Sequence, residues 1–165
     1  MMGLAGVAPS ELSKRTRILE QEGQKDEGNL SDVKFTLGCC FLKMHLYDKA
    51  LKNFEDAIDG NVENSEIYFY AAVAMLKGKR PFLTTMAILR KMQEYIEAAL
   101  LIDENPIYRV FLSYIKLDFY GRKHLRISPD WEDEYQSAME IGCNQNDVDD
   151  LFELLGQDCP DEFCE

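Results

Sequence analysis

The stretch SDVKFTLGCCFLKMHLYDKALKNFEDAIDG, residues 31–60, predicts two helices joined by a tight turn. Ser31 is a favourable N-cap before a run whose apolar residues recur at helical spacing. The periodicity breaks at His45 and Leu46 and then resumes as a second apolar stripe. Gly60 follows that stripe, and glycine ends a helix in the left-handed conformation at little steric cost. We therefore expect a helical hairpin over residues 31–60.

Small residues lie where the two predicted helices would face each other. Gly38 on the first helix, and Ala50 and Ala57 on the second, permit close approach of the two backbones. With Tyr47 at the turn and Phe54 between the alanines, the stretch has the pattern L-G-x-x-F…Y-x-x-A-x-x-x-F-x-x-A. This pattern resembles the tetratricopeptide repeat (TPR) family. The resemblance implies a superhelix of stacked helical hairpins that binds other polypeptides.

The pattern recurs in part further along the chain. A repeat of this family returns after about 34 residues. That shift places YFYAAVAMLKGK, residues 68–79, on the first helix of a second hairpin. The matching second helix is displaced, because the equivalent of Ala57 is Ala99, 42 residues later. We therefore expect eight extra residues between the two helices, around Lys79 to Arg90.

The chain is predicted to have three parts. Residues 1–30 form an N-terminal segment with one helix, about Ser10 to Glu22, and are expected to be partly disordered. Residues 31–142 form the TPR-like repeat domain, in which a third and largely apolar helix runs from about Asn105 to Tyr120. Residues 143–165 form an acidic C-terminal helix and tail. The predicted fold is all-α: a TPR-like helical-hairpin superhelix of two to three repeats plus a C-terminal capping helix.

The net charge of −12 is concentrated at one end of the 165-residue chain. From Asp130 to Glu165 there are 13 acidic residues and no Lys or Arg, whereas the preceding residues are nearly balanced. Such a block repels nucleic acid and anionic membranes and would suit a basic partner. A solvated acidic end that keeps the protein soluble is the alternative explanation.

The sequence predicts a cytoplasmic protein. No apolar run approaches the roughly 18 to 20 residues that a bilayer span needs, and the N-terminal stretch lacks the charge order of a secretory signal. The five cysteines are odd in number and two are adjacent, which does not fit a secreted disulfide framework. We expect reduced thiols.

The motifs of common enzyme classes do not occur in the sequence, so we predict no catalytic activity. His45 and His124 have no nucleophile or metal ligand at a matching spacing. Cys143, Cys159 and Cys164 could bind zinc or form a disulfide in the tail, but a fourth zinc ligand is missing. We predict no metal and no cofactor.

Basic residues flank the eight-residue insertion: Lys77, Lys79, Arg80, Arg90 and Lys91. Nucleic-acid binding is an unfavoured explanation in an acidic protein. Pairing with the acidic C-terminal region of the same chain is an equally good explanation.

The concave side of a stacked helical array is lined by the first helices of its hairpins. In the resembled family that surface binds an extended peptide or a helix. The residues that the pattern places there are Phe35, Cys39, Leu42, Lys43, Phe69, Val73, Leu76, Lys77, Phe111 and Ile115. An apolar groove of this size needs a cover. The cover could be the chain's own N-terminal or C-terminal helix, a second copy of the chain, or an amphipathic segment of a partner.

The sequence therefore predicts a protein-interaction module, an adaptor or co-chaperone that holds an amphipathic peptide in this groove. A bacterial secretion-type chaperone for a membrane-active client is the alternative. An enzyme with a site near the basic loop at Arg122 to Arg126 is the weakest hypothesis. On the first hypothesis, a charged residue in place of Phe35 or Phe69 abolishes partner capture while the fold survives.

Overall fold

The computed structural model describes residues 7–22 and 30–164, and within these residues it is all-helical, with no strand. The α-helices are α1 (Pro9–Glu22), α2 (Leu30–Lys43), α3 (Tyr47–Gly60), α4 (Ser65–Leu76), α5 (Met86–Ile102), α6 (Pro106–Ile115), α7 (Trp131–Glu140) and α8 (Gln145–Leu155). Short helical turns are η2 (Pro81–Leu83), the π-helical η3 (Lys116–Gly121) and η4 (Asp161–Phe163). The predicted all-α class is confirmed.

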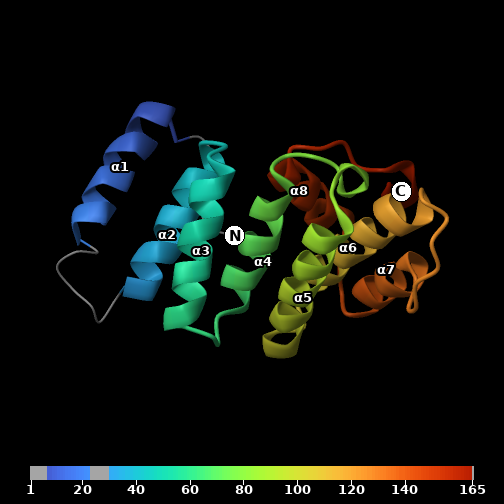
Figure 1. The fold of residues 1–165 in the computed structure, drawn as a ribbon. Helices are drawn as coiled ribbons and strands as arrows, with labels where there is room; N and C mark the ends of the chain where they lie inside the picture. The colour runs from blue at the N-terminus through green and yellow to red at the C-terminus, as the bar shows by residue number, and fades with distance from the viewer. Residues whose placement is uncertain (1–6, 23–29, 165) are drawn as a thin grey trace.

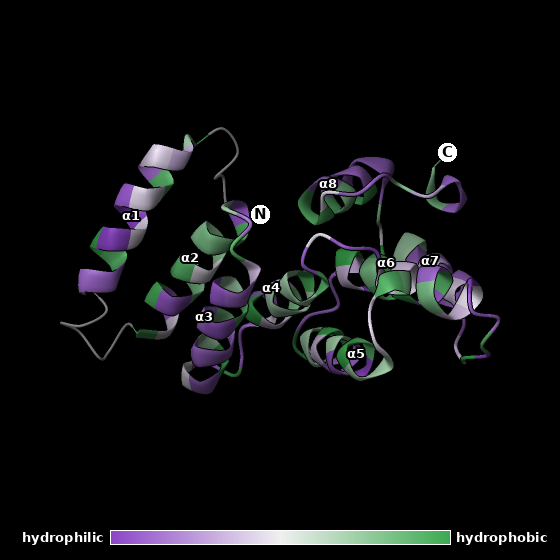
Figure 2. Cartoon of the chain, turned by 45° about the horizontal axis from the view of Figure 1, so that its top comes forward, coloured by the Kyte–Doolittle hydropathy of each residue, from purple (hydrophilic) through white to green (hydrophobic). Residues whose placement is uncertain are grey.

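The helices form a row in which neighbours in sequence are neighbours in space (Figure 1). Contacts join α1 to α2, α2 to α3, and so on through α6 and α7, while α8 returns to pack on α6. The central helices α4 and α6 are coloured mainly as hydrophobic, whereas α3 shows a hydrophilic side (Figure 2). None of the helices in the described ranges combines the length and the apolar character needed to cross a membrane.

The predicted hairpin over residues 31–60 is confirmed as α2 and α3, and its contact depends on Gly38. A Cβ atom at this position would lie 2.4 Å from Cε1 of Phe54, closer than two carbon atoms can approach. Ala50, Phe54 and Ala57 on α3 are fully buried at this contact. The absence of a side chain at Gly38 therefore lets the Phe54 ring lie against the α2 backbone.

The predicted roles of Ser31 and Gly60 were wrong. Ser31 lies inside α2, and its hydroxyl donates a hydrogen bond of 2.8 Å to the Ala57 carbonyl on α3. Gly60 is the last residue of α3, and Asn61 is the C-cap. A Cβ at Gly60 would lie 3.1 Å from the Ser31 Cβ. Both residues therefore serve the contact between the two helices rather than the ends of the helices.

The second pair of helices is joined by a longer connection than the first, as predicted, but α5 already begins at Met86, so Arg90 lies inside this helix and not in the connection. Residues 77–85 connect α4 to α5 and contain η2. The turn begins with Lys77 and Gly78, both at positive φ, which reverses the chain at the end of α4. In Figure 1 this connection arches over the top of the row close to α8.

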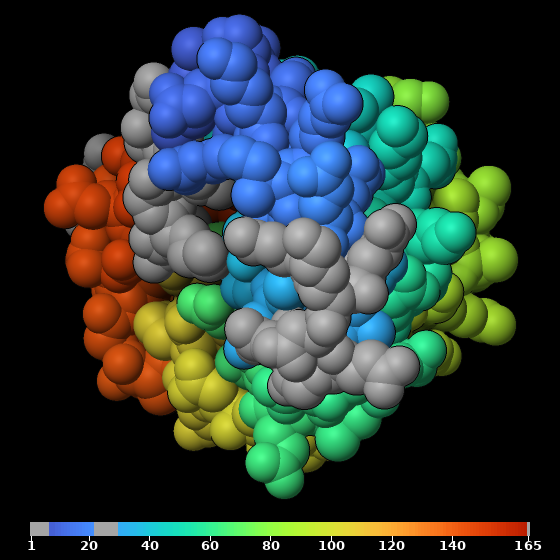
Figure 3. Space-filling view, turned by 90° about the vertical axis from the view of Figure 1, so that its left-hand side faces the viewer, coloured from blue at the N-terminus to red at the C-terminus, as the bar shows by residue number. Residues whose placement is uncertain are grey.

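The two terminal helices both pack on the row. α1 contributes Leu12 to the core and forms much of the face seen in Figure 3. α8 packs on α6, where the rings of Phe152 and Tyr114 lie 4.9 Å apart. The tail beyond α8 is held by the buried Phe163, whose ring stacks on Tyr135 at 4.7 Å. The predicted partial disorder of residues 1–30 stays a prediction, because residues 1–6 and 23–29 lie outside the described residues.

Candidate interaction surface

The side chains predicted to line the peptide groove lie mostly in the protein interior. Eight of them are buried, and only Lys43 and Lys77 are exposed; the buried ones are Phe35, Cys39, Leu42, Phe69, Val73, Leu76, Phe111 and Ile115. The Phe35 ring lies 5.8 Å from the Tyr70 ring, and the Phe69 ring lies 4.9 Å from that of Tyr108. A partner could reach them only after neighbouring helices separate, so the binding role of these residues stays a prediction.

The chain itself supplies part of the packing around these residues. Leu151, Phe152 and Leu155 of α8 are buried, and α8 packs on α6, which carries Phe111 and Ile115. α1 packs on α2, which carries the first four residues of the predicted groove. Self-coverage by the terminal helices was one of the predicted alternatives; α1 and α8 pack on helices that carry these residues, and the identity of the cover stays a prediction.

The thiols and histidines show no arrangement typical of catalysis. Burial raises the pKa of the Cys39 thiol to about 12, and burial together with the nearby Cys164 raises the pKa of the Cys159 thiol to about 12. Such thiols stay protonated and are poor nucleophiles at neutral pH. His45 Nδ1 lies 2.9 Å from the Tyr47 hydroxyl, and His124 is exposed at a positive φ. Among the described residues, no group of three His, Cys, Asp or Glu side chains is placed to hold a metal ion.

Asp118 brings together two segments that are far apart in the sequence. It lies on η3, in the apolar third helix, and its side chain is only 2% exposed. The carboxylate accepts hydrogen bonds from the Arg80 guanidinium, from the Phe82 backbone amide at 2.9 Å and from Arg122 Nε at 2.9 Å. Arg80 and Phe82 belong to the insertion and Arg122 to the basic loop, so one buried carboxylate fixes both segments.

The buried negative charge of Asp118 is compensated by groups from both segments. A buried carboxylate is stable only when its lost hydration is replaced by hydrogen bonds and opposite charge. Two guanidinium groups and one backbone amide supply this replacement. The hydrogen bond with Asp118 in turn raises the pKa of Arg80. The insertion and the basic loop therefore form one structural unit rather than two independent loops.

The exposed side of this unit combines cations with large apolar side chains. We call it the cationic–apolar surface and define it as residues 79–83 and 121–127. These twelve residues contain five of the chain's 18 Lys and Arg residues and no Asp or Glu. Phe82 is 40% exposed, Leu83 65% and Leu125 44%. The Lys123 ammonium lies 3.8 Å from the centroid of the buried Phe119 ring and 5.3 Å from that of Phe82, so it joins the charged and apolar parts.

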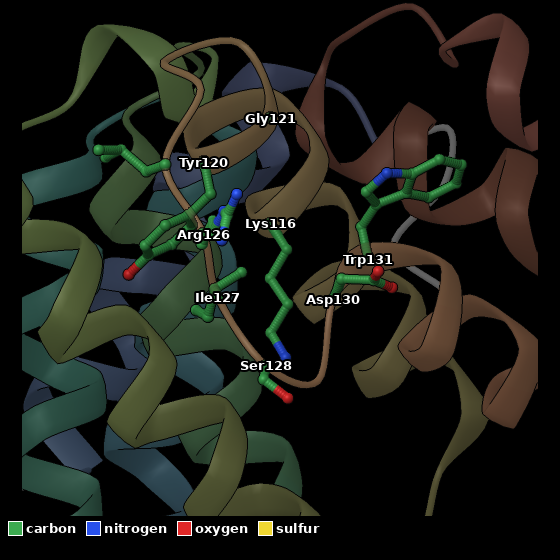
Figure 4. A pocket seen from close by; sticks show the side chains of 9 residues that line it. Lys116, Tyr120, Gly121, Arg126, Ile127, Ser128, Asp130 and Trp131 are labelled. Atoms are coloured by element: carbon green, nitrogen blue, oxygen red, sulfur yellow. The ribbon is translucent and has the colours of Figure 1, made fainter.

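Two open hollows flank the cationic–apolar surface. One, of about 550 Å³, is lined by Arg80, Phe82, Leu83 and Arg122. The other, of about 570 Å³, lies between η3 and the loop before α7. Figure 4 shows the second hollow, with the Lys116 side chain running from η3 toward Ser128.

The second hollow adjoins a buried ion pair that fixes α7. Lys116 Nζ donates to the Glu134 carboxylate and to the Pro129 carbonyl, each at 2.7 Å. Arg109 adds a bond of 3.3 Å to the same carboxylate. The Lys116 ammonium is thus already engaged by a carboxylate and a carbonyl, and the pair holds the start of α7 against α6.

The ion pairs of the insertion differ from the sequence-based alternative. Lys77 pairs with Asp48, Arg80 with Asp118 and Lys91 with Glu55, none of which lies in the acidic C-terminal region. That region is instead contacted by Arg109 and Lys116 through Glu134. Within the described residues, the region is linked to the insertion by the hydrogen bond of 2.9 Å from Gln157 Nε2 to the Lys79 carbonyl.

Asp118 was not singled out from the sequence, although one signal was available. It is the only acidic residue of the apolar stretch from Asn105 to Tyr120. A lone carboxylate in a helix that is otherwise buried requires a cationic partner. The partners could not be identified, because Arg80 lies 38 residues away in sequence.

No protein-family model matches the chain, and no curated protein sequence matches it significantly.

Proposed function

We propose that the chain is a TPR-like interaction module, of the adaptor or co-chaperone type, that binds another polypeptide. The observation that supports this proposal best is the cationic–apolar surface. It exposes Phe82 and Leu83 beside cationic side chains, on a backbone that Asp118 holds in place. Exposed apolar side chains in a fixed, polar-rimmed setting are typical of protein-binding sites.

The arrangement of the helices supports the TPR-like part of the proposal. α2 with α3 and α4 with α5 are pairs of contacting helices, as expected for repeated hairpins. The close contact of Gly38 with Phe54 agrees with the pattern that carries the resemblance. The repeat is interrupted at residues 77–85, and the binding surface is proposed at this interruption rather than in the predicted groove.

A polypeptide suits this surface better than a small metabolite. Both hollows are open rather than enclosed cavities. Small-molecule sites usually enclose most of their ligand. A peptide chain can instead place successive side chains on Phe82, Leu83 and Leu125. The proposed location is the cytoplasm, which fits the five unpaired thiols.

Selection of peptide ligands tests the proposal. A library of random peptides of about a dozen residues is displayed on phage and selected against the purified protein. We expect enriched peptides whose binding is lost in the double variant Phe82→Ser/Leu83→Ser. The matched control is Leu101→Ser on α5. The Leu101 side chain is 89% exposed, and the residue lies outside the cationic–apolar surface. The proposal fails if no peptide is enriched, or if the control reduces binding as much as the double variant.

A further inference from the structure

We propose that the occupant of the cationic–apolar surface is a short acidic peptide segment that carries a large apolar side chain. This inference rests on the proposed function and specifies the chemistry of its partner. Three observations support the inference: the positive charge of the surface, the guanidinium groups at the first hollow, and the acidic region that adjoins the surface.

The charge of the surface selects an anionic partner. Arg80 and Arg122 share the single carboxylate of Asp118, so this cluster keeps a positive charge after its internal pairing. Lys79, Lys123 and Arg126 add three exposed cations. No acidic residue occurs within residues 79–83 or 121–127. A local positive excess in a protein of net charge −12 marks a place where a negative ligand gains energy on contact.

The first hollow can hold a carboxylate beside an apolar group. Each guanidinium has five N–H donors. The bonds to Asp118 are made by Nη2 of Arg80 and by Nε of Arg122. Arg80 and Arg122 line the same hollow as Phe82 and Leu83, and Arg80 also has a side-chain hydrogen bond with Tyr114. A peptide carboxylate can thus bind the two arginines while a neighbouring apolar side chain covers Phe82 and Leu83.

The adjoining acidic region favours a short ligand over an extended polyanion. The hydrogen bond between Gln157 and Lys79 brings the C-terminal region to the edge of the surface. α8 and the residues after it carry exposed carboxylates, among them Asp149, Asp150 and Asp158. A membrane surface or a nucleic-acid duplex would extend over these carboxylates and be repelled. A short peptide contacts the cations without crossing the acidic region.

Fluorescence anisotropy with labelled synthetic peptides tests the inference on the full chain. The first probe alternates Asp and Glu with Leu and Phe. The second replaces Asp and Glu with Asn and Gln, the third replaces them with Lys, and the fourth replaces Leu and Phe with Ala. We expect the first probe to bind at least about tenfold more tightly than each of the others, and its affinity to fall as salt is added.

A pair of charge variants locates the binding. Lys79→Gln/Arg126→Gln neutralises two exposed cations of the surface and leaves the bonds to Asp118 intact. We expect the first probe to bind this variant roughly five- to tenfold more weakly. Lys52→Gln/Arg90→Gln removes the same charge from exposed positions on α3 and α5, and should weaken binding less than about twofold.

The possible results separate the inference from the proposed function. If the neutral or the basic peptide binds as tightly as the acidic one, the inference is overturned while polypeptide binding stands. If none of the four probes binds, both are overturned for this surface. Vesicles of phosphatidylcholine and phosphatidylserine form a further arm. If they bind the protein through Lys79 and Arg126 while the peptides do not, the partner is a membrane and the inference fails.

Discussion

The backbone amide of Phe82 donates a hydrogen bond of 2.9 Å to the carboxylate of Asp118, which lies 36 residues further along the chain. This bond fixes the loop between α4 and α5 against the end of the third predicted helix. Phe82 and Leu83 of this loop are exposed and belong to the cationic–apolar surface.

Removal of the Asp118 charge should destabilise the fold. Asp118→Asn keeps the size of the side chain but leaves Arg80 and Arg122 without their carboxylate. Because both arginines are about half exposed, we expect a loss of about 1–3 kcal/mol in the free energy of unfolding, below the value for a fully buried pair. Urea unfolding measures this loss. The control is Asp56→Asn, which removes an exposed ion pair with Lys34 and should cost under about 1 kcal/mol. Equal losses in Asp118→Asn and Asp56→Asn would contradict the structural role of Asp118.

A methyl group at Gly38 should disrupt the first hairpin. In Gly38→Ala the new Cβ would lie 2.4 Å from the Phe54 ring, so α2 and α3 must move apart or the ring must leave its position. We expect a loss of about 1–3 kcal/mol, as for other overpacked cores. Gly121→Ala is the matched control, because its nearest neighbour would lie 3.9 Å away. If the two variants have the same midpoint of urea unfolding, the close contact does not exist in solution.

Substitution of the predicted groove phenylalanines should act on the fold rather than on binding alone. Phe69 is 3% exposed and packs on Tyr108 and Phe111. We expect Phe69→Ala to reduce the free energy of unfolding by about 3–5 kcal/mol. A charged residue in place of Phe35 or Phe69 should unfold much of the chain. The sequence alone instead predicts that the fold survives this substitution. Thermal unfolding followed by circular dichroism decides this, and an unchanged midpoint would indicate an open groove.

The protein should lose stability at alkaline pH. Burial raises the pKa of Cys39 from 9.0 to about 12 and that of Tyr114 from 10.0 to about 12. The folded state therefore holds these protons more tightly than the unfolded state. Their contribution is complete below about pH 9 and is lost as the pH rises toward 12. Urea unfolding at a series of pH values measures the loss.

Two cysteine variants serve as controls for the alkaline loss. Cys39→Ala should reduce the loss, because it removes one of the buried groups that must ionise. Cys164→Ala should also reduce the loss, because Cys164 contributes to the raised pKa of the neighbouring Cys159 thiol. A free energy of unfolding that stays constant between pH 8 and pH 11 would show that these thiol and phenol groups are not buried in solution.

The local features of the fold could be predicted from the sequence. Apolar spacing and the break at His45 gave helices close to those found. The small residue at Gly38 indicated a close contact, which the structure places against Phe54. These features depend on neighbouring residues, so a single sequence contains the information.

The site could not be predicted in the same way. Apolar spacing shows that the faces with Phe35 and Phe69 are buried, but not whether a partner or the next helix buries them. The rings of Phe69 and Phe111 lie 5.8 Å apart across 42 residues of sequence. The link from Asp118 to Arg80 and Phe82 spans a similar distance in sequence. Such contacts depend on how the hairpins stack, which apolar spacing along a single sequence does not define.

The most direct test of the central claim is nitrogen-15 NMR of the labelled protein during titration with the acidic–apolar peptide. The account predicts that the amide signals that shift belong mainly to residues 79–83 and 121–127, with smaller changes at Asp118. Shifts confined to α2 and α4, around Phe35 and Phe69, would instead place the partner in the predicted groove and contradict the account. A spectrum that does not change at saturating peptide would contradict polypeptide binding at this surface altogether.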